Sequence, residues 1–133
     1  MDIRIYYEDT DAAGVVYHSN YIKYFERART EYLRDNGLTV AQFAEDGFVF
    51  PVIRVEIEYK SPARLDDLLT ITTLPVRTGG SSFTISHSVI RKSDGTVMAE
   101  AVITLVCVNP ELKPVRIPAT LRTLLESVPA PHE

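Results

Sequence analysis

A change in hydrophobic period near residue 50 constrains the fold most strongly. On its N-terminal side, apolar residues recur at the spacing of one helix face, in a stripe formed by Tyr21, Phe25, Ala28 and Tyr32 and widened by Ile22 and Leu33. Ser19 or Asn20 is placed to cap this helix, and Gly37 is placed to end it. From Val52 onward, apolar and polar residues alternate, which is typical of strands. The sequence therefore predicts one long helix followed by a series of strands.

The predicted strands form an antiparallel sheet. The strand that begins at Val52 has charged residues on one face and apolar residues on the other, namely Ile53, Val55, Ile57 and Tyr59. Three further runs follow at Leu69–Thr73, Phe83–Val89 and Ile103–Val108, and the turn residues between them indicate a meander. A short strand at Ile3–Ile5 precedes the helix. We therefore expect an α+β fold with a five-stranded, mainly antiparallel sheet.

The whole chain, residues 1–133, is predicted to form a single domain, because no linker or low-complexity stretch interrupts the pattern. Residues 129–133 are expected to be a frayed tail. Thr39 and Gln42 form a capping-box pattern for a short helix that ends at Gly47, and Pro118 is placed to open a terminal helix. One long helix covers only one face of such a sheet, so we expect the remaining apolar positions to meet a second subunit.

Charge and composition exclude several classes of function. The chain has 14 Lys and Arg residues against 18 Asp and Glu residues, a formal net charge of −4, which does not favour binding to nucleic acid. No stretch approaches the roughly 20 apolar residues that span a bilayer, and the first residues do not resemble a secretory signal. We therefore expect a cytoplasmic protein without a transmembrane segment. The single cysteine, Cys107, cannot form an internal disulfide or a cysteine-rich zinc site.

Three isolated candidates for catalytic chemistry have simpler explanations. Ser81 follows Gly79-Gly80 but lacks the second glycine of a nucleophile elbow. Cys107 lies in an apolar run, which is typical of an inert buried thiol. His87 alternates with apolar residues along one predicted strand, which indicates a core or interface histidine. None of the three is therefore assigned a catalytic role.

The greatest density of reactive side chains lies between the first strand and the helix. Residues 7–18 contain three carboxylates, a glycine and a histidine, namely Glu8, Asp9, Asp11, Gly14 and His18. A solvated acidic turn is the simplest interpretation. A calcium loop starting at Asp9 fails, because Ala13 and Asn20 then occupy positions that need an oxygen ligand and a glutamate. A catalytic loop is the third interpretation, since a helix N-terminus directs free N–H groups and its positive dipole end at these residues.

The spacing of these residues resembles the signature of the 4-hydroxybenzoyl-CoA thioesterase-like hotdog proteins, through Asp9, Asp11, Gly14, Val15, Val16, His18 and Tyr21. Segments 6–11, 25–29 and 61–67 add to the resemblance, which covers nearly the whole chain. It is closest to the acyl-CoA thioesterases encoded beside the Tol–Pal envelope system, the YbgC type. The resemblance implies a hotdog fold, with a long central helix wrapped by the sheet, and a homodimer or homotetramer. It implies hydrolysis of an acyl-CoA to free acid and CoA without a metal or other cofactor.

By position, the resemblance assigns the catalytic carboxylate to Asp11, as nucleophile or general base, and the oxyanion donor to the backbone N–H of His18. Tyr7 and the His18 side chain would orient water or substrate. The residues expected to bind substrate are Gly14, Val15, Tyr21, Phe25, Arg64, Arg77, Gly80, Ser81 and Ser82. Simpler roles stay open: Asp9 caps a turn, Tyr7 packs, and Arg64 forms a surface ion pair.

The substrate and the function class have alternatives at this stage. Bulky residues of the helix and of the segment Phe48–Pro51 are expected to restrict the acyl group to a short aliphatic or aromatic one. The thioester could be carried by CoA or by an acyl-carrier protein. The alternative functions are a hotdog hydratase or dehydratase, which needs an imidazole as acid or base, and a non-catalytic acyl-thioester-binding or assembly module.

Overall fold

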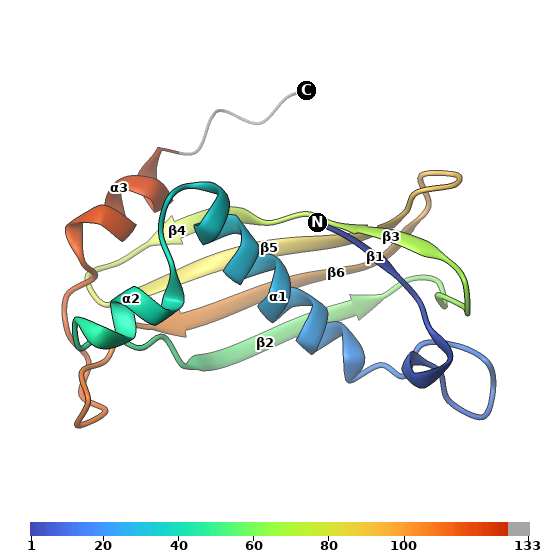
Figure 1. Cartoon of the computed structure of the whole chain (residues 1–133), viewed down its shortest axis with the longest axis horizontal. Helices are drawn as coiled ribbons and strands as arrows, with labels where there is room; N and C mark the ends of the chain where they lie inside the picture. The colour runs from blue at the N-terminus through green and yellow to red at the C-terminus, as the bar shows by residue number, and fades with distance from the viewer. Residues whose placement is uncertain (128–133) are drawn as a thin grey trace.

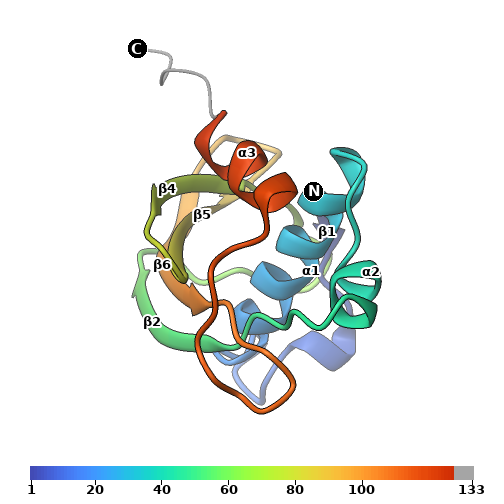
Figure 2. The same cartoon turned by 90° about the vertical axis from the view of Figure 1, so that its left-hand side faces the viewer.

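The computed structural model describes residues 1–127, so the predicted tail at residues 129–133 lies outside the described residues. One long helix crosses the concave face of a curved sheet, and two short helices lie at one end (Figures 1 and 2). The elements in chain order are β1 (Asp2–Arg4), the 3₁₀ helix η1 (Tyr7–Asp9), α1 (Asn20–Asp35), α2 (Val40–Glu45), β2 (Val52–Tyr59), β3 (Leu68–Ile71), β4 (Leu74–Thr78), β5 (Ser82–Arg91), β6 (Val97–Val106) and α3 (Ala119–Glu126).

The sheet has the strand order β1-β3-β5-β6-β2, β4 also pairs with β5, and these pairings are antiparallel. The α+β prediction is therefore correct, but the sheet has six strands rather than five within residues 1–127, because the run predicted at Leu69–Thr73 ends at Ile71 and a separate strand, β4, begins at Leu74. The break between β3 and β4 coincides with contacts that Thr72 makes to β5. The carbonyl of Thr72 lies 2.9 Å from the His87 ring, and its hydroxyl accepts the Ser88 N–H at 2.9 Å.

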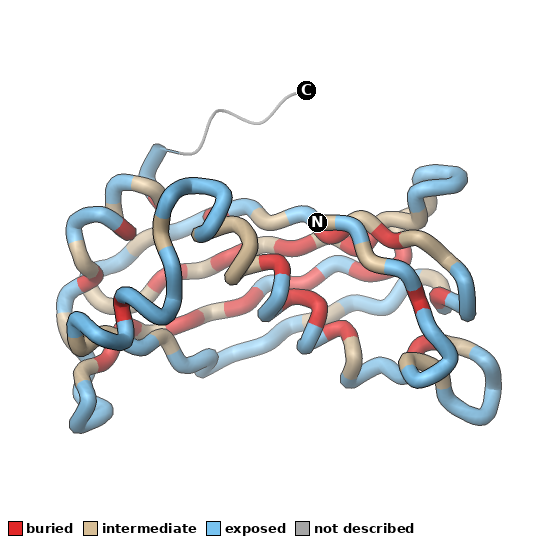
Figure 3. The backbone as a smooth tube through the Cα atoms, viewed as in Figure 1, coloured by how far each residue is buried: buried red, intermediate tan, exposed pale blue. Residues whose placement is uncertain are grey.

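Helix α1 packs one face onto the concave side of the sheet, where buried residues line both elements (Figure 3). The buried residues of α1 are Tyr21, Tyr24, Phe25 and Ala28. The buried stripe thus includes Tyr24, whereas Tyr32 is half-buried and Ile22 is 44% exposed. Ile22 therefore lies at the edge of the buried face of α1, not in the core.

The ends of α1 lie close to the predicted positions. Gly37 adopts a φ of +79°, and the N–H of Leu38 bonds back into the last helical turn at 2.9 Å, a C-terminal arrangement that favours glycine. At the start, Ser19 occupies the N-cap position without a side-chain cap hydrogen bond. The side chain of Asn20 instead donates to Asp9 at 3.3 Å, which ties the helix to the preceding loop.

The two short helices also begin near the predicted positions. The Thr39 hydroxyl accepts the Gln42 N–H at 3.1 Å, but the Gln42 side chain donates to Asp46 at 3.3 Å, so only half of the predicted capping box forms. Helix α3 begins directly after Pro118. No helix within residues 1–127 is both long enough and apolar enough to cross a membrane.

Strand β2 lies at the edge of the sheet, and its apolar face is only partly covered. Val55 and Tyr59 pair with buried residues of β6, so they point to the helix side, yet they are 38% and 48% exposed. A register shift between Val52 and Arg54 makes Ile53 a bulge residue. Because Ile53 lines a hollow of the outer face together with Arg54, the prediction that it shares a face with Val55 is wrong.

Candidate active site

Asp9 holds the loop between β1 and α1 against the helix. One carboxylate oxygen accepts the Tyr6 N–H at 2.8 Å, and the other accepts the Asn20 side chain at 3.3 Å. Burial, together with the nearby Asp9 carboxylate, raises the pKa of the Tyr24 hydroxyl. Asp9 therefore caps the turn and anchors the loop, which is the simpler role that the sequence left open.

Asp11 is exposed and is oriented by its own loop. Its Oδ1 accepts the Ala13 N–H at 2.8 Å, and its backbone N–H donates to the Val15 carbonyl at 2.9 Å. Gly14 closes the turn by donating to the Asp11 carbonyl at 2.9 Å, with a φ of +78° that favours glycine. Within residues 1–127, Oδ2 of Asp11 has no hydrogen-bond partner. The loop thus fixes the carboxylate and leaves one of its oxygens free.

His18 lies immediately before α1. Its carbonyl accepts the Tyr59 hydroxyl at 3.0 Å, and its ring centroid lies 4.8 Å from that of Tyr17 and 6.1 Å from that of Tyr59. In the described part of the chain, the His18 N–H donates to no backbone carbonyl or side chain. An unpaired N–H at the start of a 16-residue helix is suited to an oxyanion.

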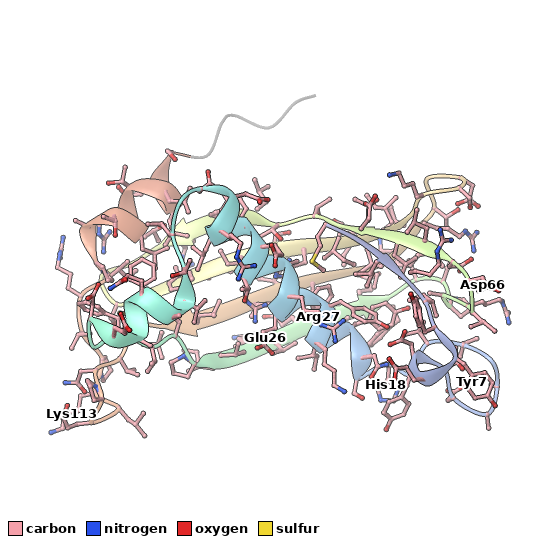
Figure 4. The ribbon with its side chains drawn as sticks, in the orientation of Figure 1. Tyr7, His18, Glu26, Arg27, Asp66 and Lys113 are labelled. Atoms are coloured by element: carbon pink, nitrogen blue, oxygen red, sulfur yellow. The ribbon has the colours of Figure 1, made fainter. Side chains whose placement is uncertain are left out.

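Tyr7 and Arg64 flank the same loop. Tyr7 is 82% exposed and lies at the same end of the molecule as His18 (Figure 4). Arg64 forms an isolated β-bridge with Val15, and its backbone N–H donates to the Asp67 carboxylate at 2.9 Å. Within residues 1–127 the Arg64 guanidinium makes no ion pair, so the surface ion pair that the sequence suggested is not formed.

Tyr21 and Phe25 are buried in the core, with 3% and 0% of their surface exposed. The Phe25 ring stacks on His87, with centroids 4.8 Å apart and an interplanar angle of 10°. Burial lowers the pKa of His87 to about 4, so its ring is neutral at pH 7, and Nδ1–H donates to the Thr72 carbonyl. The prediction of a core histidine is confirmed, while substrate contacts of Tyr21 and Phe25 stay predictions.

We expect the buried His87 to make the stability of the fold depend on pH. Its pKa is 6.5 when unfolded and about 4 when folded, so between these pH values the unfolded state binds more protons. The contribution of neutral His87 to the free energy of unfolding is complete above pH 6.5. It is lost as the pH falls to 4, which lowers the free energy of unfolding by about 3 kcal/mol. Urea unfolding across this range measures the loss. His87→Gln, which cannot titrate, should show a flatter dependence, and identical slopes would contradict the assignment.

The other predicted substrate-binding residues lie at the opposite end of the sheet, in and beside the β4–β5 turn (Figure 1). They are Arg77, Gly80, Ser81 and Ser82. Arg77 and Ser82 line an open hollow on the outer face of the sheet. The Arg122 side chain donates to the carbonyls of Gly79 and Gly80 at 2.8 and 3.1 Å, which fixes the turn. A single chain therefore does not bring this group to Asp11.

An apolar cavity of about 300 Å³ lies between α1, the α2–β2 segment, α3 and the sheet. Val49 and Phe50, from the segment predicted to restrict the acyl group, lie in its wall. Helix α1 contributes Ile22 and Glu26, which the sequence analysis did not assign to the site. The signal that could have found them is their spacing of four residues on the face next to the buried stripe.

Comparison with known proteins assigns the chain to a family. A family model described as the Thioesterase-like superfamily matches residues 6–125. The chain belongs to this superfamily. It is 39% identical over 120 residues to the acyl-CoA thioester hydrolase YbgC of Escherichia coli O6:H1, covering 90% of this chain and 89% of that one. It is 38% identical over 122 residues to the acyl-CoA thioesterase YbgC of Haemophilus influenzae, covering 90% of this chain and 88% of that one.

This member of the thioesterase-like superfamily also matches a solved structure closely. The crystal structure of a 1,4-dihydroxy-2-naphthoyl-CoA thioesterase from Synechocystis superposes with a TM-score of 0.89, over 96% of this chain and 94% of that one, at 22% identity. At this identity the likeness concerns the fold. The predicted family, the α+β hotdog fold and the enzyme class of thioesterase are confirmed.

The cavity extends from Ile22, about one helical turn after His18, to a far end that is distant from the loop. The loop with Asp11 and His18 lies near Tyr59, at the end of β2. The cavity includes Val52, at the start of β2. A strand rises about 3.3 Å per residue, so the two ends of β2 are about 23 Å apart.

Proposed function

We propose that the chain hydrolyses acyl-CoA thioesters, with Asp11 as the reacting carboxylate and the His18 N–H as the oxyanion donor. The observation that carries the proposal is the pairing of a fixed carboxylate that has a free oxygen with an unpaired N–H at the start of a long helix. The names of the E. coli and H. influenzae relatives support the substrate class. The roles of Tyr7 and of the other predicted contacts are proposals of the same kind.

The reaction follows from these groups. The thioester carbonyl oxygen accepts the His18 N–H, and negative charge that develops on it is stabilised by the positive end of α1. In one route, Oδ2 of Asp11 bonds to the carbonyl carbon, the C–S bond breaks with release of the CoA thiolate, and water then hydrolyses the mixed anhydride to the free acid and the Asp11 carboxylate. In the other route, Oδ2 accepts a proton from water as the water oxygen bonds to the carbonyl carbon, and the C–S bond then breaks to release the free acid and the CoA thiolate. Single turnover in isotopically labelled water distinguishes them, because label in the Asp11 carboxylate requires the anhydride.

We further propose that two chains pair through β2 to form a homodimer. Within residues 1–127, no strand pairs with the outer edge of β2, which is eight residues long. Its helix-side apolar face is only partly covered, and proteins normally cover such edges and faces. If two β2 strands pair antiparallel about a two-fold axis, the Tyr59 end of one lies beside the Val52 end of the other. The catalytic loop of one chain then faces the cavity of its partner. Pairing of two such dimers into a tetramer is the alternative assembly.

Release of thiol from a panel of acyl-CoAs of increasing length tests the proposed function. We expect short aliphatic and aromatic acyl groups to react faster than long ones, because the cavity has a volume of only about 300 Å³. A rate that rises steadily through the long-chain substrates would contradict the size limit. Hydration of an enoyl thioester without thiol release would identify a hydratase, and binding without either reaction would identify a non-catalytic module.

Three further predictions from the sequence belong to this proposal. They are the cytoplasmic location, the association with the Tol–Pal system, and the use of an acyl-carrier-protein thioester in place of acyl-CoA. The same thiol assay with acylated carrier protein compares the two thioesters directly.

A further inference from the structure

Within residues 1–127, the cavity carries a guanidinium that forms no ion pair with a carboxylate. Arg29 lines the cavity, is half-buried, and within residues 1–127 makes no ion pair. In the same part of the chain, its one hydrogen-bond partner is Nε2 of His87, 3.2 Å from Nη1. A guanidinium has five N–H donors. The nitrogens of Arg29 are not among the fully enclosed atoms without a partner, so its free donors reach open space.

His87 fixes the position of this guanidinium. Its Nδ1 donates to the Thr72 carbonyl at 2.9 Å, and burial keeps the ring neutral at pH 7. Nε2 therefore carries a lone pair, which accepts the Arg29 N–H. The ring itself is held by stacking on Phe25. A polar histidine in the core is thus explained as a positioning residue for Arg29.

The surroundings of Arg29 favour an anionic ligand group. Most of the cavity wall is aliphatic or aromatic. A guanidinium with unused N–H donors in such surroundings is stabilised by a ligand carboxylate that accepts hydrogen bonds from it. The cavity volume of about 300 Å³ suits a short acyl chain. Burial lowers the pKa of Arg29, and Glu26, which also lines the cavity, raises it electrostatically to a smaller extent. Glu26 is exposed to solvent, and within residues 1–127 it forms no hydrogen bond or ion pair with the guanidinium.

We propose that Arg29 selects acyl groups with a carboxylate at the end remote from the thioester, so that the preferred substrates are monothioesters of short dicarboxylic acids. The inference rests on the proposed hydrolysis of acyl-CoA thioesters and names the acyl class for the same site. Arg29 contacts the terminal carboxylate of the substrate, and His87 positions the guanidinium of Arg29.

Adipyl-CoA and hexanoyl-CoA test the selection, because the two acyl chains have the same number of carbons and differ in the terminal carboxylate. We expect the wild-type protein to prefer adipyl-CoA by about tenfold or more in kcat/KM, the effect of one charge-assisted contact. Arg29→Met should lower kcat/KM for adipyl-CoA by about the same factor and leave that for hexanoyl-CoA within about threefold. Arg29→Lys, which keeps the charge but not the planar fork, should retain part of the preference.

The matched control is Arg27→Met, an exposed arginine on the same helix (Figure 4), which should leave the preference unchanged. Equal kcat/KM for the two substrates in the wild type, or equal losses for both in Arg29→Met, would overturn the inference. Calorimetry with free adipate and hexanoate gives a readout without turnover. Tighter binding of adipate that Arg29→Met abolishes would support the role of Arg29 even if no acyl-CoA were hydrolysed, and equal binding would count against it.

Discussion

Replacing Asp11 by asparagine is expected to lower kcat by about 10²- to 10⁴-fold, the usual contribution of a positioned acid–base group. Asparagine keeps an acceptor for the Ala13 N–H, so the loop should retain its conformation, but the charge of the free carboxylate oxygen is lost. The measurement is steady-state thiol release with the best acyl-CoA of the panel. Retention of more than about a tenth of kcat, a barrier change below about 1.4 kcal/mol, would contradict the assignment.

Three further variants separate a chemical effect from a structural one. Glu8→Gln removes a neighbouring exposed carboxylate and should leave kcat within about twofold. Asp9→Asn should instead lower the stability of the fold, because both Asp9 oxygens accept hydrogen bonds. His18→Ala should reduce kcat less than Asp11→Asn, since the proposed donor is the backbone N–H, and an equal loss would point to a catalytic imidazole. Circular dichroism and size-exclusion chromatography verify that each variant folds and assembles.

The elements that were predicted correctly depend on local patterns. The period of α1, the positive φ at Gly37 and the alternation in β2 are all determined within a few residues of the chain. The break between β3 and β4 was not predicted, since it coincides with a contact between His87 and Thr72, which are 15 residues apart. The bulge at Ile53 was also missed, since the alternation of residue types continues through it.

The candidate site also combines a part that a short motif predicts with a part that depends on segments far apart in the sequence. Asp11 is oriented by Ala13 and Val15, so a short motif is enough to identify the loop. The cavity is formed by segments from α1 to α3, and no single stretch of sequence contains it. Arg29 lies inside a motif segment, but its partner His87 is 58 residues away, and the alternation of His87 with apolar residues predicted only its burial.

Val55→Lys is expected to convert the proposed dimer into a monomer and to lower turnover by about 100-fold or more, because a charge at the middle of β2 would be buried without a partner in the interface. Val76→Lys is the matched control. Val76 is also exposed, by 52%, but lies on β4, which does not pair with β2, so this variant should stay dimeric and active. Sedimentation velocity gives the assembly state and thiol release gives the activity. A fully active monomer would contradict a site between subunits.

Mixing two inactive variants tests directly whether the loop of one chain uses the cavity of the other. Asp11→Asn disables the loop, and Ile22→Trp obstructs the cavity that Ile22 lines. If each site combines one loop with the partner's cavity, a heterodimer of the two variants has one site built from both intact parts. Random reassociation makes half of the dimers mixed, so activity should return to about a quarter of the wild-type value. If loop and cavity act within one chain, both sites of every dimer stay defective and no activity returns.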